Sequence, residues 1–89
     1  MLFRSLGWSA LAANSSGVNN TAVGNQSMQA NTVGSNNVAV GYGVLTSNTR
    51  GSCNVAIGFN SLYSNTTGGG NVAIGYGTLY CNKIGRAHV

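Results

Sequence analysis

Few side chains in this sequence could carry out catalysis or hold a metal ion. The 89 residues include no Asp or Glu, two cysteines and a single histidine. Without carboxylates, the chain cannot supply a general acid and base pair or the oxygen ligands that Ca²⁺ and Mg²⁺ require. Cys53 and Cys81 are too few for a four-ligand zinc site, and we interpret them as free thiols at small-residue positions. We therefore expect no enzyme activity, no catalytic residue, no metal and no cofactor.

The basic residues do not indicate a nucleic acid partner. The formal net charge is +4, but Lys83 and Arg86 lie within the last seven positions of the chain. That segment resembles the translated start of a sequencing adapter, and we interpret residues 83–89 as a non-native tail. Arg4 and Arg50 remain, and two isolated arginines make no basic stripe, so we expect no binding to nucleic acid.

The sequence is built on a 17-residue repeat that continues without an insertion. Each repeat contains a pentad that ends in glycine, as in Asn54-Val55-Ala56-Ile57-Gly58. The pentad glycines are Gly7, Gly24, Gly41, Gly58 and Gly75. Three further columns follow at the same period: Leu11, Met28, Leu45, Leu62 and Leu79; Asn14, Asn31, Asn48, Asn65 and Asn82; Gly17, Gly34, Gly51 and Gly68. Self-similarity at a fixed period is the signature of repeat architectures, so we expect these columns to carry the structure.

The pentad has the pattern of a short β-strand. Large and small side chains alternate over residues 38–42, which is the period of two that a strand requires. A 17-residue repeat leaves no room for a crossover helix, so strands of successive repeats must be parallel and stacked directly on one another. We predict an all-β fold, a parallel β-solenoid or β-roll of about five coils, as one domain over residues 1–82.

Two features of each coil stay open at this level. An aromatic residue and a leucine follow the pentad glycine, as in Tyr42 and Leu45, and fit either a helical turn or a second short strand. The later Asn and Gly columns suit a corner, because Gly and then Asn most easily adopt positive φ. Stacked Asn side chains can also bond to the coils above and below, as in cross-β stacks.

The strand pattern also leaves open which of its faces fills the interior. Either the large residues Val38 and Val40 or the small residue Ala39 point into the narrow coil. With the large residues inside, the chain is a monomeric solenoid. With the small residues inside, a β-branched stripe is exposed along the chain, and partner chains are expected to cover it because it is too apolar for a soluble monomer.

The pentad of Asn, a variable residue, Ala, Ile or Val, and Gly, together with Asn65-Thr66-Thr67-Gly68, resembles the head repeats of YadA-like trimeric autotransporter adhesins. It is also similar to related repeats of phage tail fibres. The resemblance spans Leu6 to Asn82 and implies a left-handed parallel β-roll with three chains side by side, exposed on a bacterial outer membrane surface or in a virion tail fibre. The head repeat of that family is typically shorter, and we expect the extra residues to enlarge the corner around residues 48–52.

This interpretation predicts a structural and adhesive fibre segment. Repeated loops at residues 48–52 and 65–70 would give multivalent attachment to a host surface protein or glycan. Aromatic residues, including Tyr63, could stack on sugar rings, although we favour a packing role for them. The candidate adhesive surface contains Tyr63, Tyr80, Arg50 and Thr66. No apolar run approaches the roughly 18 residues that span a membrane, so we expect no membrane insertion by this segment.

Two other functions fit the repeat. The first is a purely architectural spacer of a tail fibre or surface stalk that binds no ligand. The second is an ice-binding solenoid, which uses flat and regular threonine arrays. Here Thr32, Thr49 and Thr66 form a single column, so we regard ice binding as the remote alternative.

Overall fold

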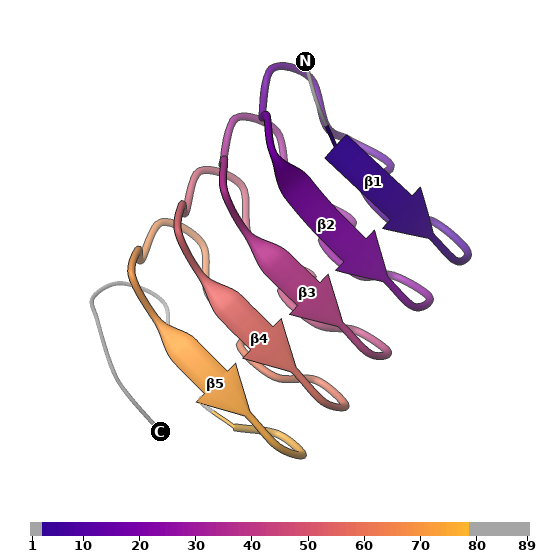
Figure 1. Ribbon diagram of the computed structural model, residues 1–89, viewed down its shortest axis with the longest axis vertical. Coiled ribbons are helices and arrows are strands. Elements are labelled where there is room, and N and C mark those ends of the chain that lie inside the picture. Colours follow the sequence, from indigo (N-terminus) through magenta and orange to yellow (C-terminus); the bar gives the residue numbers. More distant parts are fainter. Residues whose placement is uncertain (1–2, 79–89) are drawn as a thin grey trace.

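The computed structural model describes residues 3–78, with side chains from residue 7 onward. These residues form a single parallel sheet in the order β1-β2-β3-β4-β5 and contain no helix (Figure 1). The strands are β1 (Phe3–Leu6), β2 (Asn20–Val23), β3 (Val38–Val40), β4 (Val55–Ile57) and β5 (Val72–Ile74). The prediction of an all-β chain built on a parallel sheet is confirmed.

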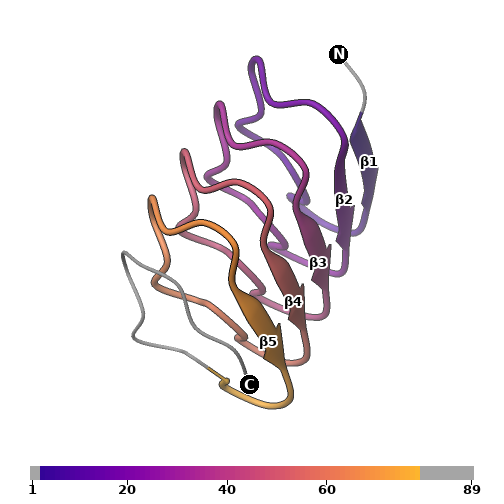
Figure 2. The ribbon, with the colours of Figure 1, turned by 60° about the vertical axis from the view of Figure 1, so that its left-hand side comes forward.

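Each strand pairs with its own copy in the next repeat. Ala39 is the register partner of Ala22 on one side and of Ala56 on the other, so each step across the sheet corresponds to one repeat of the sequence. Seen from the side, the repeats form a stack of similarly shaped loops with the strands along one wall (Figure 2). Residues of the same column therefore lie above one another, and whatever one repeat places on a surface, the next repeat places beside it.

The small residues of the strands point into the interior. Ala22, Ala39, Ala56 and Ala73 are fully buried. They face a second buried column of Leu11, Met28, Leu45 and Leu62, which comes from the opposite wall. Because the leucine and methionine side chains already fill the narrow interior, only a methyl group fits on the strand side. The alternative in which the large strand residues form the core is wrong for this chain.

The segment after each pentad glycine is neither of the two predicted forms. Residues 42–47 are a turn with alternating backbone conformation, in which Gly43 and Leu45 have φ of 68° and 51°. Its N–H groups bond to the next repeat, as from Leu45 N to the carbonyl oxygen of Ser61 (3.1 Å) and from Ser47 N to that of Tyr63 (3.2 Å). Stacking therefore continues through this wall by hydrogen bonds even though no strand forms there.

Glycine is required at the corners because there is no room for a side chain, and not because the backbone there needs positive φ. Gly34 and Gly51 do not have positive φ, and a Cβ on Gly34 would collide with the carbonyl oxygen of Gly51. The Asn31 column likewise lacks positive φ, which occurs instead at Asn19 and Asn36. The expectation that the predicted Asn and Gly columns serve positive φ is therefore wrong. Of the two glycine columns, it is the pentad glycines that have positive φ, as at Gly41 with 128°, where the strand turns into the next wall.

Candidate functional site

A ladder of buried asparagines runs along the corner of the stack. The side-chain Nδ2 of Asn31 donates to Oδ1 of Asn14, that of Asn48 to Asn31, and that of Asn65 to Asn48, each at 2.9 Å. Each Nδ2 also donates to the carbonyl oxygen of the glycine three residues later, as from Asn48 to Gly51 at 3.0 Å. Asn82 lies outside the described residues. The amides that the sequence singled out are thus committed to one another inside the protein and are not presented to a ligand.

A second asparagine ladder is formed by the first residues of the later pentads, Asn20, Asn37, Asn54 and Asn71. From the sequence, these residues were interpreted only as part of the strand pattern. Asn37 donates its backbone N–H and its Nδ2 to Oδ1 of Asn20, both at 3.1 Å. Its Nδ2 also donates to the carbonyl oxygen of Gly51 at 2.8 Å, which is the oxygen that Asn48 bonds. The two ladders therefore meet at the glycine carbonyls. The recurring Asn at the start of the pentads was the available signal for this network.

The predicted adhesive loop at residues 48–52 is a tightly bonded corner. The successive N–H groups of Thr49, Arg50 and Gly51 all donate to one acceptor, the carbonyl oxygen of Thr66, at 3.1 to 3.2 Å. This brings Arg50 directly beside Thr66 in the next repeat. The Arg50 side chain is exposed and Thr66 is partly buried. Such a corner holds its exposed side chains in place and has little freedom to adapt to a partner.

Of the other two predicted adhesive residues, only Tyr63 belongs to the part of the chain that the structure describes. Tyr63 is partly buried and lies in the turn wall, where its carbonyl oxygen accepts the Ser47 N–H bond. Tyr80 lies outside the described residues, as do Leu79 and Cys81. Among the three candidate residues that the structure describes, Arg50 lies beside Thr66 and is exposed, whereas Tyr63 belongs to the turn wall.

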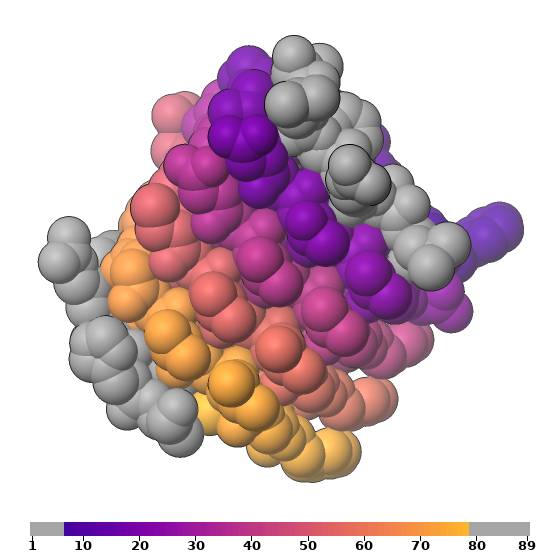
Figure 3. Space-filling model, viewed as in Figure 1, coloured from indigo at the N-terminus to yellow at the C-terminus, as the bar shows by residue number. Residues whose placement is uncertain are grey.

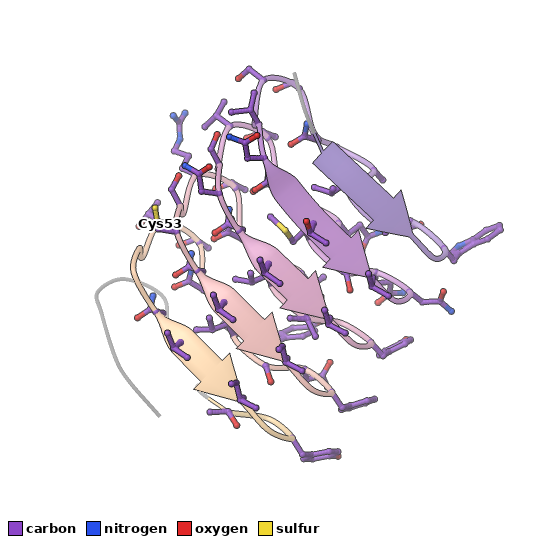
Figure 4. The ribbon with its side chains drawn as sticks, in the orientation of Figure 1. Cys53 is labelled. Atoms are coloured by element: carbon purple, nitrogen blue, oxygen red, sulfur yellow. The ribbon has the colours of Figure 1, made fainter. Side chains whose placement is uncertain are left out.

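An aromatic ladder forms at the turn that follows the strands. Tyr42 and Phe59 stack with ring centroids 5.4 Å apart and planes 11° apart, and Phe59 and Tyr76 stack at 5.1 Å and 8°. The three residues are 47%, 40% and 82% exposed, respectively. Rings at these turns project outward, away from the sheet (Figure 4). The middle ring, Phe59, is stacked on both faces and offers mainly its edge to solvent, which does not suit stacking on sugars.

The aromatic ladder does not extend to the first repeats. Trp8 occupies the same column and is exposed, but Asn25 stands between it and Tyr42. The Asn25 side chain accepts a hydrogen bond from the Trp8 backbone N–H at 2.8 Å. The continuous ladder is therefore confined to the repeats of β3, β4 and β5.

The outward face of the sheet carries a second apolar stripe. Val38, Val55 and Val72 and the neighbouring Val40 are partly buried, whereas Ile57 and Ile74 are 37% and 56% exposed. Figure 3 views the molecule from this side, where side chains of successive repeats lie in parallel rows. No charged residue occurs in β2 to β5. An exposed apolar row without charge is a candidate surface for contact with another molecule.

Groups that could perform chemistry are scarce in the described part of the chain. Residues 3–78 contain no cluster of His, Cys, Asp and Glu that could hold a metal ion. Cys53 is an exposed free thiol, and His88 lies outside the described residues. Within the same range, no helix is long and apolar enough to cross a membrane. The exposed apolar surface is thus the feature of this structure most suited to a function.

Comparison of the chain with protein-family models, curated proteins and solved structures finds no match.

Proposed function

We propose that this chain is a segment of a structural and adhesive fibre, a parallel β-solenoid of 17-residue coils whose copies lie side by side as a homotrimer. The proposal rests mainly on the orientation of the strands, whose small side chains point inward and whose large side chains point outward. The strand alanines point into the interior, while the Val and Ile side chains of the strands and the aromatic rings of the turns remain outside, in rows without charge. Leaving this surface in water is unfavourable, and a second copy with the same rows removes it from water.

The internal bonding supports a role that depends on stiffness. Strand pairing and asparagine side chains join the successive repeats of β2, β3, β4 and β5. The repeats of β2, β3 and β4 are also joined at the corner, where three N–H groups of one repeat meet on one carbonyl oxygen of the next. Bonds of this kind recur at each step along the stack axis, so bending the stack stretches many of them together. A rod of this construction suits a stalk or tail fibre on a bacterial surface or a virion, in line with the resemblance to trimeric adhesins and phage fibres.

Adhesion would use the exposed corner column. Ser16, Val33, Arg50 and Thr67 point outward at the same corner of successive repeats. Weak contacts from several repeats and three chains add up to useful avidity for a host surface protein or glycan. In this proposal the segment acts without catalysis, cofactor, nucleic acid or membrane insertion.

A spacer without a ligand is the second candidate, and one observation favours it. The outward residue at the corner changes from repeat to repeat in polarity and charge, whereas a repeated binding motif would keep the same side chain. The spacer and the adhesive fibre share the fold and the assembly and differ only in what the corner does.

The mass of the full chain in solution, measured by light scattering across a concentration series, tests the assembly. Three times the 9.0 kDa of one chain is expected. A monomer at the highest soluble concentration would contradict the fibre proposal.

Cell or glycan binding by Arg50→Ser and Thr67→Ala, two exposed residues of the corner column, then separates the two candidates. The adhesive fibre loses binding while its mass stays the same. A spacer shows no binding in either the parent or the variants.

A further inference from the structure

The exposed apolar residues form two stripes on different sides of the stack. We define the strand face as the outward side chains of β3, β4 and β5, and the aromatic ladder as Tyr42, Phe59 and Tyr76. Between them the chain turns at the pentad glycines, of which Gly58 has a φ of 119°. The rings project from the turn and not over the sheet (Figure 4). A single flat partner placed on the strand face would therefore leave the ladder uncovered.

Neither stripe alone is large enough for a stable interface. Three strands about 4.8 Å apart, each three residues long, cover a flat patch of roughly 10 Å by 10 Å. A standard interface buries about 800 Å² on each partner, several times more. A dimer that buried only one stripe would be weak. An assembly in which each copy uses both stripes buries more surface per copy than a one-stripe dimer, and closing a ring makes the last contact intramolecular, so weak contacts reinforce one another.

Another copy of this chain is the partner that both stripes fit. The chain has no acidic residue, so two copies attract each other only through uncharged surface. Both stripes are uncharged and lie away from Arg50, the one charged side chain described. The rows of the strand face and the rings of the ladder also advance by the same step per repeat. Rows on one copy therefore stay matched to rings on another along the whole contact.

We propose that the aromatic ladder of one copy packs on the strand face of the next, and that three such contacts close into a ring. This inference rests on the proposed homotrimer and identifies the two surfaces that meet in it. The contact is heterologous, because two different patches are joined, and heterologous contacts form rings when the rotation closes. A symmetric face-to-face dimer would bury the Ile57 row twice and leave Phe59 in water.

Two variants of the full chain separate these arrangements. The face variant carries Ile57→Thr and Ile74→Thr, and the ladder variant carries Tyr42→Ser and Phe59→Ser. All four side chains are exposed, so both variants are expected to retain the parent circular dichroism spectrum. The heterologous ring predicts that each variant weakens self-association by about tenfold or more, because each removes one side of every contact. Val33→Thr, an exposed β-branched residue at the corner, is the matched control and should assemble like the parent.

Mixing the two variants gives the decisive measurement. The ladder variant keeps an intact strand face, and the face variant keeps an intact ladder. The ladder variant is isotope-labelled, and the amide NMR signals of its β3 to β5 are followed. In the ring arrangement, adding unlabelled face variant shifts these signals, whereas adding unlabelled ladder variant leaves them unchanged. If the ladder variant assembles like the parent, or if mixing produces no shifts, the heterologous contact is refuted although the homotrimer can still stand. A monomeric parent chain refutes both.

Discussion

Replacing Asn48 by alanine tests whether the buried amide ladder holds the stack together. Asn48 is fully buried in the middle of the described repeats. Its Nδ2 donates to Oδ1 of Asn31 (2.9 Å) and to the carbonyl oxygen of Gly51 (3.0 Å), and its Oδ1 accepts from Nδ2 of Asn65 (2.9 Å). Alanine removes all three bonds and keeps the backbone unchanged.

The magnitude follows from what each former partner retains. Gly51 still accepts from Asn37, and Asn65 still donates to Gly68. The Oδ1 of Asn31 loses the donor from the neighbouring repeat. Three hydrogen bonds at about 1 kcal/mol each, with about 1 to 2 kcal/mol more for a buried acceptor left without a partner, sum to roughly 4 to 5 kcal/mol. That is a large part of the stability of a typical domain, which is roughly 5 kcal/mol to roughly 15 kcal/mol.

Urea unfolding followed by circular dichroism, at one fixed protein concentration, measures this loss. Asn25→Ala is the matched control, because Asn25 is exposed and its side chain accepts one hydrogen bond of 2.8 Å, from the Trp8 backbone N–H. We expect that control to lose about 1 kcal/mol or less. If Asn48→Ala were no more destabilising than Asn25→Ala, the ladder would be a by-product of stacking and the reasoning would fail.

Other parts of the stack can be tested one at a time. Leu45→Ala should cost about 2 to 5 kcal/mol in urea unfolding, because it opens a cavity opposite the alanine column, and a loss below about 1 kcal/mol would mean that the interior collapses around it. Gly51→Ala should abolish the cooperative transition or lower its midpoint sharply, since the new Cβ would meet the Gly68 carbonyl oxygen and the Asn48 side chain; an unchanged midpoint would contradict the close corner packing. Asn60→Gly should raise stability by about 1 kcal/mol, because Asn60 has a φ of 56° and a buried Oδ1 without a hydrogen bond; no gain would show that this oxygen is solvated. Since no Asp or Glu exists to bind protons differently in the two states, the unfolding free energy should stay flat from about pH 4 to 6, and a fall on acidification would contradict this.

Part of the architecture could be predicted from the sequence because it depends only on spacing. Similar pentads at a constant short spacing must pair parallel to their copies, one repeat apart. The structure has this register, as in the pairing of Ala39 with Ala56. Most acid and base chemistry could likewise be excluded from the sequence alone, because the chain has no Asp or Glu. The candidate adhesive cluster could not be predicted from the sequence, because whether Arg50 and Tyr63 share a surface depends on how the wall between them turns.

The sequence by itself determined the repeat, the strand direction and the columns that stack. Only the tertiary structure decided that alanine faces inward and that Val, Ile and the aromatic rings remain outside. The reason is that an alternating strand is equally consistent with both orientations, and the choice depends on the volume that the Leu45 column takes up from the opposite wall. The glycine requirement at the corner is of the same kind, since it arises from a carbonyl oxygen in the next repeat.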